Sequence, residues 1–487
     1  MARFRHLCLA TSLLLGCAPA RAPGPSSKEA PGALDRLRHE ADHARWHYVV
    51  TAEDDLEDLV IEASLEGAAS PRLGVDRPAE RFLYGVEVLR DDAWRPALVD
   101  DGEVVIPDCQ RRCRLRYRFA LRAAAEQLRD EEVADWEGGT ALSPPSAWLL
   151  RPPDRGVPYV FRVPQRPSGL SFVSGVWPDA QAAGAFGGDS ADLWRSPYSA
   201  FGRFRREQIA VAGSQLEVAI AGEPSAIDAA ATLAWIDHAA KIVAGYFGRF
   251  PLPRALVLVV PRRGQRIGGR QIGGGGAAII LQVGEQAGPM HFARDWVAVH
   301  EMIHLAVPAM PRRHLWLTEG LATYVEPLAR ARRGELPVAT VWRDMLRGMP
   351  HGLPEEGDEG LDRTATWGRT YWGGALFALT ADLAIREQTG GAKSLDDALR
   401  AVVQAGGHNG VSWPMRRFLA EADRGTGTRV LSELYAKWSV TPVTVDLESL
   451  WEALGVHVEA GGEVRFDDEA PRAALRRALT QPRDPTD

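Results

Sequence analysis

Hydrophobic and polar residues follow two different periods along this chain, and the period changes near residue 224. Between residues 46 and 206 the pattern is typical of strands and turns. In residues 113–121 charged and apolar positions alternate, with the charges at Arg114, Arg116 and Arg118. Such alternation gives a strand one charged and one apolar face. Repeated prolines after residue 143 exclude long helices there. We therefore predict an antiparallel β domain over residues 37–222.

After residue 224 the apolar spacing becomes helical. Residues 227–247 carry apolar side chains three and four positions apart, and Pro251 then ends the predicted helix. An apolar run over residues 255–260 predicts a buried strand. Glycine-rich residues 268–276 predict a loop that leads into a further strand over residues 276–283. We assign residues 223–400 to this second, mainly helical domain.

The last part of the chain is also predicted to be helical. Apolar spacing indicates helices over residues 415–422, 430–438 and 447–454, a short strand over residues 464–466 and a final helix from Ala470. Residues 401–487 therefore form a small C-terminal helical region, in which we expect no PDZ domain. The predicted fold class is α+β.

The N-terminus is typical of an exported protein. Residues 1–16 contain Arg3 and Arg5, no acidic residue, and an apolar core, which is the layout of a signal peptide. Cys17 follows, and the segment from Leu14 to Cys17 resembles a bacterial lipobox, in which the cysteine is acylated. Residues 17–36 are rich in small residues and proline and predict a flexible linker. An ordinary signal peptide with a chance cysteine is the alternative.

The lipobox resemblance implies a lipoprotein of the bacterial cell envelope that is attached to a membrane through Cys17. Ala18 stands where many inner-membrane lipoproteins have an aspartate, so we expect the outer membrane. No apolar run approaches the roughly 20 residues that span a bilayer. The lipid is therefore the expected membrane contact.

Composition excludes one class of partner. The chain has 487 residues, with 57 Lys and Arg against 64 Asp and Glu, which gives a net charge of −7. Proteins that bind nucleic acid need a concentrated basic surface, so we expect no nucleic-acid partner. The sequence does not indicate an oligomeric state.

Cys109 and Cys113 are the two cysteines that remain beyond the N-terminal segment. In an oxidising compartment, two thiols four residues apart can form a small disulfide loop. A metal-binding pair is the alternative, but no second pair of Cys or His stands nearby. The disulfide is the favoured prediction.

The motif that points to chemistry is His300-Glu301-Met302-Ile303-His304. Two histidines four residues apart lie on one face of a helix, so both imidazoles can reach one metal ion while Glu301 flanks it. A catalytic zinc site has three protein ligands and an open position. Glu319, on a helix predicted to begin just before it, is the expected third ligand. We predict one Zn²⁺ held by His300, His304 and Glu319.

These motifs resemble the gluzincin metallopeptidases. The stretch from Trp316 to Tyr324 resembles the second zinc helix of the M1 and M61 aminopeptidase families. The stretch from Tyr371 to Gly374 and the later Ser-Leu-Asp-Asp at residues 394–397 are more similar to M61, the glycyl aminopeptidase family. The resemblance implies a thermolysin-like zinc peptidase domain preceded by a β domain. It also implies that Glu301 moves the proton of the attacking water and that Tyr371 donates to the developing oxyanion.

The resemblance further implies that an edge strand holds an extended peptide substrate. We place this strand at Gly275, Gly276, Ala277 and Ala278 and onward to about residue 283. Aminopeptidases of these families have a glutamate in that motif, which binds the free amine of the substrate, and no carboxylate stands here. Aminopeptidase and endopeptidase action therefore both stay open.

The sequence thus predicts a zinc metallopeptidase that hydrolyses peptide bonds of peptides or proteins in the cell envelope. The alternative is a lipoprotein that uses the same scaffold without catalysis, either to bind peptides or to assist envelope assembly. All four residues of the predicted zinc chemistry are present, which favours the enzyme.

Overall fold

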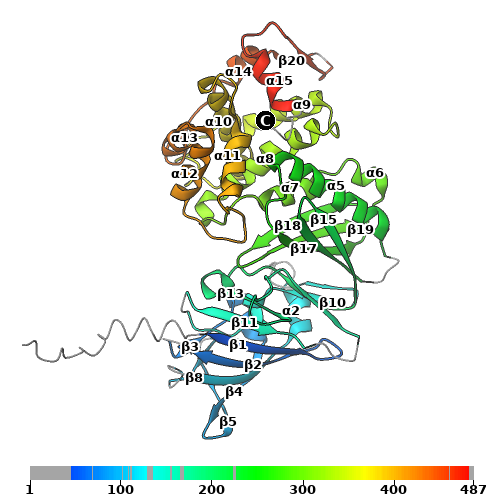
Figure 1. The fold of residues 1–487 in the computed structure, drawn as a ribbon, viewed down its shortest axis with the longest axis vertical. Coiled ribbons are helices and arrows are strands. Elements are labelled where there is room, and N and C mark those ends of the chain that lie inside the picture. Colours follow the sequence, from blue (N-terminus) through cyan, green and yellow to red (C-terminus); the bar gives the residue numbers. More distant parts are fainter. Residues whose placement is uncertain are drawn as a thin grey trace, which may run out of the picture. The chain divides into compact units, whose positions relative to one another are not determined.

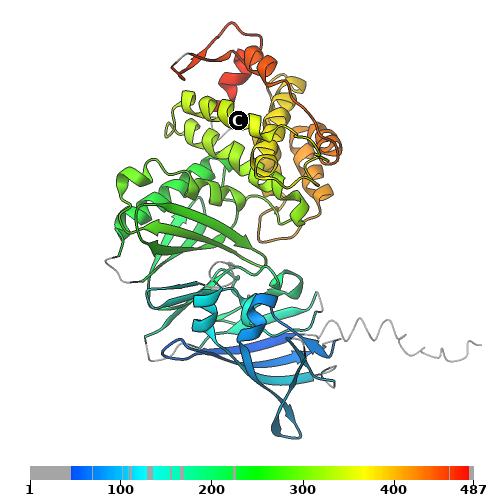
Figure 2. The same ribbon diagram turned by 180° about the vertical axis from the view of Figure 1, so that it is seen from behind.

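A computed structural model describes residues 45–481 except 68–69, 101, 108, 110–111, 129–134, 154–155, 165–168, 223–225 and 460. The fold is mixed α+β, with sheets in the N-terminal part and helices in the C-terminal part (Figures 1 and 2). The predicted signal peptide, linker and Cys17 lie outside the described residues. Among the described residues, no helix combines the length and apolar character needed to cross a bilayer.

The N-terminal part contains a seven-stranded sheet with the order β13-β11-β1-β2-β8-β4-β5. Its strands are β1 (Trp46–Ala52), β2 (Leu59–Glu66), β4 (Leu83–Arg90), β5 (Ala93–Pro96), β8 (Arg112–Phe119), β11 (Pro158–Arg162) and β13 (Ala185–Asp189). The predicted alternating strand is β8, in which Leu115, Tyr117 and Phe119 are buried and Arg114 and Arg116 are exposed. One pair departs from the antiparallel prediction, because β1 and β11 run parallel.

Two smaller sheets complete this part. The first is β12-β14-β10-β9, formed by β12 (Ser171–Ser174), β14 (Ser199–Gly202), β10 (Thr140–Ser143) and β9 (Asp135–Glu137). The second contains β3 (Arg72–Leu73), β7 (Glu103–Val105) and β6 (Leu98–Asp100). Short helices connect the strands: η1 (Arg77–Phe82), α2 (Leu121–Gln127), α3 (Pro145–Trp148) and α4 (Ser190–Leu193).

A five-stranded sheet, in the order β15-β16-β17-β19-β18, supports the C-terminal part. Its strands are β15 (Phe204–Val211), β16 (Ser214–Ala221), β17 (Arg254–Arg262), β18 (Ile267–Gly273) and β19 (Ala277–Gly284). The predicted domain boundary at residues 222 and 223 divides this sheet. The reason is that helix α5 (Ala229–Phe247) carries the chain from β16 to the parallel strand β17, a pairing that local sequence does not reveal.

Both faces of this sheet are covered. Residues Val257 and Val259 on β17 belong to the core shared with the helices. Leu256 and Leu258 on the same strand belong to a second core with Leu142 and other residues of the four-stranded sheet. A strand that is buried on both faces needs a continuous apolar run, and the run over residues 255–260 therefore predicts this strand correctly.

Helices make up most of the remainder. They are α6 (Pro289–Phe292), α7 (Val297–His304), η2 (Arg312–His314), α8 (Leu315–Arg332), α9 (Val338–Gly348), η3 (Met349–Gly352), η4 (Arg369–Gly373), α10 (Gly374–Gln388), α11 (Leu395–Gln404), α12 (Met415–Thr426), α13 (Val430–Trp438), α14 (Leu447–Leu454) and α15 (Ala473–Thr480). A hairpin of β20 (Val456–Val458) and β21 (Val464–Phe466) lies between the last two helices.

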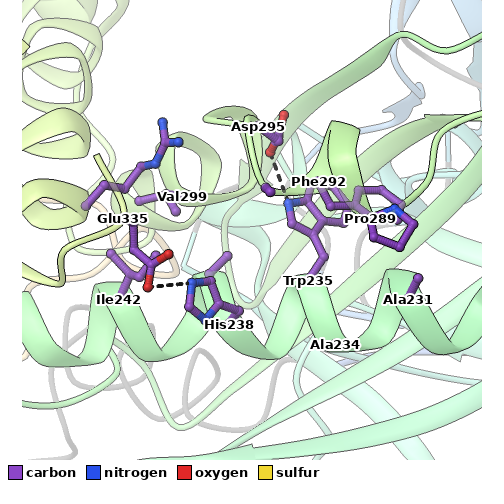
Figure 3. Close-up of a pocket in the computed structure, with 13 residues that line it drawn as sticks. Ala231, Ala234, Trp235, His238, Ile242, Pro289, Phe292, Asp295, Val299 and Glu335 are labelled. Atoms are coloured by element: carbon purple, nitrogen blue, oxygen red, sulfur yellow. Dashed lines mark hydrogen bonds and ion pairs between the residues drawn. The ribbon is translucent and has the colours of Figure 1, made fainter. Parts of the chain in front are cut away.

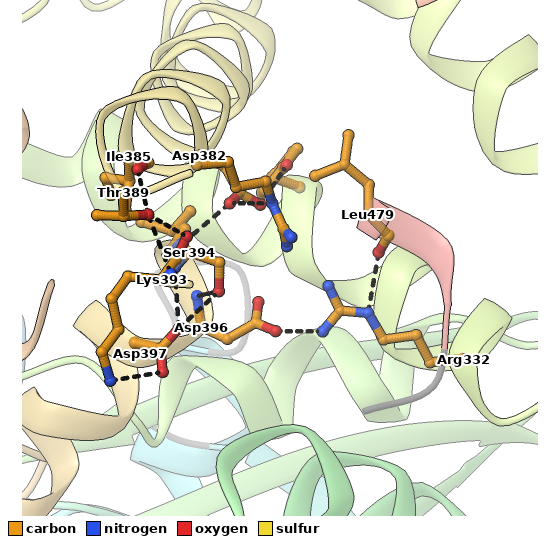
Figure 4. Close-up of polar contacts among 12 residues, drawn as sticks. Arg332, Asp382, Ile385, Thr389, Lys393, Ser394, Asp396, Asp397 and Leu479 are labelled. Carbon is orange, nitrogen blue, oxygen red and sulfur yellow. Dashed lines mark hydrogen bonds and ion pairs between the residues drawn. The ribbon is translucent and has the colours of Figure 1, made fainter. Parts of the chain in front are cut away.

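A buried polar network ties several of these helices together (Figure 4). Arg332, at the end of α8, pairs with the fully buried Asp396 of α11 at 2.6 Å and donates to the Leu479 carbonyl of α15 at 2.9 Å. Asp382 of α10 accepts from Arg386 and from the backbone N–H of Leu395. Because α8 also carries Glu319 near its other end, this network fixes the helix that supplies the predicted third ligand.

Candidate metal centre and active site

Helix α7 holds the two predicted histidine ligands in a buried position. All of its residues, Val297–His304, are buried. Asp295 fixes the start of the helix, because its Oδ2 accepts from the backbone N–H of Ala298 at 3.1 Å and from Trp235 Nε1 at 3.2 Å. The His300 and His304 rings lie one turn apart, with centroids 4.8 Å from each other. Both rings therefore share one face of the helix, as the spacing predicts.

Helix α8 supplies Glu319. The helix begins at Leu315, directly after the short turn η2, so Glu319 is its fifth residue and lies in the second turn rather than the first. The earlier start follows from residues 312–314, which already turn as a 3₁₀ helix and pass without a break into α8. The Glu319 side chain is 17% exposed and reaches both histidines.

The three predicted ligands converge. Glu319 Oε2 lies 3.4 Å from His300 Nε2 and 3.5 Å from His304 Nε2, and the three ligand atoms lie within 4.8 Å of one another. Ligands about 2.1 Å from a tetrahedral zinc ion stand about 3.4 Å apart. The donor set of two imidazoles and one carboxylate is also one that zinc accepts. The residues present therefore fit a zinc ion.

The charges in this cluster are coupled. Burial lowers the pKa of His300, and the neighbouring His304 lowers it further. Burial acts in the same direction on His304, but the hydrogen bond to Glu319 and the charges of Glu319 and Glu301 outweigh it and raise the pKa of His304. Although burial opposes ionisation of Glu319, its two histidine partners lower its pKa to about 2. Glu319 is therefore a carboxylate at neutral pH, and it favours a proton on His304.

Glu301 lies beside the cluster and under strand β18. The Glu301 residue is buried on α7. A β-carbon placed on Gly269 would stand 2.6 Å from Glu301 Cγ and 2.7 Å from Val297 Cγ1, so only glycine fits on the strand at this point. The absence of a side chain at residue 269 lets the strand lie directly against the glutamate.

Tyr371 lies on η4, a single turn of π-helix that leads into α10. The tyrosine is half-buried, and burial raises the pKa of its phenol. The charges of Glu319 and Glu301 raise this pKa further. The structure therefore brings Tyr371 close enough to interact electrostatically with the carboxylates of Glu319 and Glu301.

The predicted substrate strand is wrong in its position. Gly275, Gly276, Ala277 and Ala278 belong to the turn before β19 and to β19 itself, and β19 lies between β17 and β18 inside the sheet. Their main-chain groups are also engaged: Gly275 accepts from Trp177 N–H and donates to the Gly410 carbonyl, and Ala277 donates to the Gly175 carbonyl. These residues cannot pair with a peptide.

The edge strand next to Glu301 is β18, which the sequence prediction treated as a loop because of its glycines. Glycine is required at Gly269 and Gly273 because the backbone approaches Glu301 and Asn409 closely there. Among the glycines of residues 268–276, only Gly275 (φ +63°) and Gly276 (φ +159°) have positive φ angles. The available signal was the placement of Gly268 and Gly269 between Ile267 and Ile272, with Gly273 directly after, which is compatible with a strand.

Cys109 and Cys113 are joined by a disulfide in the structure, with Cα atoms 4.9 Å apart. Both cysteines are fully buried in the core of the N-terminal sheets. The sulfurs are therefore not available as a metal pair in this state.

A separate cavity of about 410 Å³ lies between α5, α6 and α7 (Figure 3). Trp235 stacks on Phe292 in its wall, and His238 pairs with Glu335 at 3.0 Å. The α7 residue that lines it is Val299, which the helical period places about 100° and about 140° around the helix from His300 and His304. Neither His300 nor His304 is among the residues that line this cavity.

No protein-family model matches this chain, and no curated protein matches its sequence. Solved structures do match the fold. An aminopeptidase N family protein from Idiomarina loihiensis aligns over 85% of this chain and 79% of its own, with a TM-score of 0.65 and 13% identity.

Two variant structures of M1 zinc metallopeptidases also match. One is a two-domain enzyme bound to L-arginine (TM-score 0.52, 17% identity, 83% of this chain and 94% of that one). The other is from Deinococcus radiodurans (TM-score 0.50, 17% identity, 83% and 95%). The fold of this chain is therefore similar to that of these M1 zinc metallopeptidases.

Proposed function

We propose that this protein is a zinc-dependent peptidase that hydrolyses peptide bonds in the bacterial cell envelope. The observation that carries the proposal is the convergence of His300, His304 and Glu319, in which the carboxylate oxygen lies 3.4 and 3.5 Å from the two imidazole nitrogens, close to the edge length of a tetrahedral zinc site. One ion would bind to these three residues. When bound, zinc supplies Lewis-acid chemistry, which polarises a carbonyl oxygen and acidifies water.

Glu301 and Tyr371 supply the proposed proton chemistry. Glu301 would accept a proton from the attacking water and later deliver it to the leaving amine, as a general base and then a general acid. Tyr371 would donate a hydrogen bond from its hydroxyl to the oxygen that becomes negative as the water attacks. Its raised pKa keeps that proton on the phenol at neutral pH.

Strand β18 is the proposed binding edge for the peptide. It is the last strand of its sheet, so one row of its main-chain groups has no strand partner in the part of the chain that the structure describes. An extended peptide that adds to such an edge gains main-chain hydrogen bonds. Since Gly269 of this strand lies on Glu301, a peptide paired with β18 would pass the catalytic residues.

The finer family assignment rests on sequence segments alone. The motifs at residues 371–374 and 394–397 resemble M61, and we propose an M61-like enzyme on that basis. This sequence lacks the edge-strand glutamate that binds the free amine of the substrate in the family. Both exopeptidase and endopeptidase action are therefore possible outcomes of the cleavage assay.

Membrane attachment through an acylated Cys17 is part of the proposal. The disulfide between Cys109 and Cys113 supports an oxidising compartment. Metabolic labelling with palmitate tests the attachment: we expect label on the wild-type protein and none on Cys17→Ala. Label on both proteins would contradict lipidation at Cys17.

The enzyme itself is tested with zinc stoichiometry and peptide cleavage of three proteins that lack the N-terminal segment: wild type, Glu301→Gln and Glu319→Gln. We expect one zinc and cleavage for wild type, one zinc without cleavage for Glu301→Gln, and reduced zinc for Glu319→Gln. Equal cleavage by wild type and Glu301→Gln would remove Glu301 from the mechanism. Zinc binding without cleavage in all three would favour a peptide-binding protein.

A further inference from the structure

Two strongly exposed tryptophans stand next to a proposed zinc ligand and the proposed oxyanion donor. Trp296 is 51% exposed and Trp367 is 62% exposed. Tryptophan has a large apolar surface and is usually well buried, so an exposed ring beside a site is a candidate contact for a ligand. The two rings come from different segments, one before α7 and one before η4.

Trp296 extends the row of rings on α7. It precedes His300 by one turn, and their ring centroids lie 5.3 Å apart at an interplanar angle of 86°. His300 in turn lies 4.8 Å from His304. Both histidines are buried, whereas Trp296 is open to solvent. The indole therefore forms the exposed end of a row whose other members are predicted zinc ligands.

Trp367 has the same relationship to Tyr371. It precedes the tyrosine by four residues, and the two ring centroids lie 6.3 Å apart at 33°. The His351 ring also contacts this indole, with its centroid 5.7 Å away. These neighbours hold the indole beside the proposed oxyanion donor while most of its surface remains exposed.

We propose that Trp296 and Trp367 form two aromatic walls that bind large apolar or aromatic side chains of a peptide substrate close to its scissile bond. This inference rests on the proposed peptidase function and adds its substrate class. Side chains on one face of an extended peptide repeat about every 6.6 Å, and each indole lies within about that distance of a site residue. The walls therefore reach substrate residues within about two positions of the scissile bond.

The chemistry favours an apolar side chain. An indole face that is half-exposed gains by covering an apolar or aromatic group, which removes both surfaces from water. Because each indole already packs against a neighbouring ring of the site, little further ordering is needed when a peptide binds. Small side chains such as those of Gly and Ala would leave both indole faces exposed.

The test compares two series of blocked peptides of equal length, with Phe or Leu in one series and Ala in the other on both sides of a central bond. We expect the wild type to have a kcat/KM at least about 10-fold higher for the apolar series. Trp296→Ala and Trp367→Ala should each lose about 10-fold on that series, mainly through KM, and change less than about 2-fold on the Ala series. Trp→Phe should restore most of the loss.

Trp94 provides a matched control, because it lies on β5 of the seven-stranded sheet and packs on Arg116. Trp94→Ala should leave both series unchanged. Equal losses on both peptide series, or no loss in either tryptophan variant, would overturn the inference.

Binding separates this inference from the proposed hydrolysis. Fluorescence anisotropy measures labelled peptides on zinc-loaded Glu301→Gln, with and without each tryptophan substitution. Selective binding of apolar peptides without cleavage by wild type would retain the aromatic walls and reject hydrolysis. Cleavage by wild type without preference for apolar peptides would retain hydrolysis and reject the aromatic walls. Failure of apolar peptides to bind would also overturn the aromatic walls.

Discussion

Gly269 of strand β18 lies directly on the side chain of Glu301. A β-carbon at residue 269 would stand 2.6 Å from Glu301 Cγ and 3.2 Å from Cδ. Real β-carbons do not approach another atom so closely, so one partner would have to move. The close contact with Gly269 therefore restricts the position of the Glu301 side chain, which is the proposed proton acceptor and donor.

This relationship predicts the effect of Gly269→Ala. The added methyl group should displace Glu301 and lower kcat by about 10-fold or more, because small misplacement of a catalytic group is costly. Zinc stoichiometry should stay at the wild-type value, since the three ligands are not touched. Gly268→Ala is the control, because its β-carbon would meet only Gln282, at 3.6 Å. Equal kcat values for the two variants would contradict the role of this contact.

The sequence was sufficient to predict the residues that periodicity and motif spacing control. Helices α5, α13 and α14 and the convergence of His300 and His304 follow from local spacing, because residues three and four apart share a helix face. Glu319 was expected as the third ligand because it stands on a predicted helix that follows the two histidines, and the structure shows that it reaches both of them.

The strand arrangement could not be predicted in the same way. That β19 is interior and β18 is the edge depends on pairings between residues far apart in sequence, such as Leu256 with Ala278. The glycines of β18 are signals of close approach to Glu301 and Asn409, and sequence alone does not distinguish these from glycines in a loop. The same limit applies to Trp296 and Trp367, whose exposure only the folded chain reveals.

Tyr371→Phe tests the proposed oxyanion contact. Removing the hydroxyl should lower kcat by about 100-fold or more, as loss of one oxyanion donor does elsewhere, with little change in KM. Zinc stoichiometry and thermal stability should match the wild type, because the ring itself remains. Single-turnover cleavage measures the effect on chemistry. A kcat within about 2-fold of wild type would show that the phenol does not stabilise the transition state.

The raised pKa of His304 predicts how zinc binding depends on pH. Zinc needs neutral imidazole, so protons compete with the metal. The pKa of His304 in the metal-free cluster is raised above 6.5. Zinc affinity should therefore decline as pH falls through that raised value, by about 10-fold per pH unit once below it. Competition with a chromophoric chelator between pH 5.5 and 8 measures this decline.

Glu301→Gln should shift the midpoint of that decline to lower pH, because the Glu301 charge is one cause of the raised His304 pKa. Glu335→Gln removes a carboxylate that pairs with His238 instead and should leave the midpoint unchanged. An identical midpoint for wild type and Glu301→Gln would contradict the coupling between Glu301 and His304.

Arg332→Met tests whether the buried network holds helix α8 in place. The Arg332 and Asp396 side chains are 8% and 0% exposed, so the substitution would leave a buried carboxylate without its cationic partner. Loss of one member of such a pair costs about 3–5 kcal/mol. Denaturant unfolding followed by tryptophan fluorescence should show this loss. In the double variant with Asp396→Asn, part of the stability should return, because the uncompensated charge is gone.

Arg112→Met is the control. It breaks an exposed pair with Glu66 and should cost less than about 1 kcal/mol. If Arg332→Met costs no more than Arg112→Met, the network does not stabilise the helix that carries Glu319.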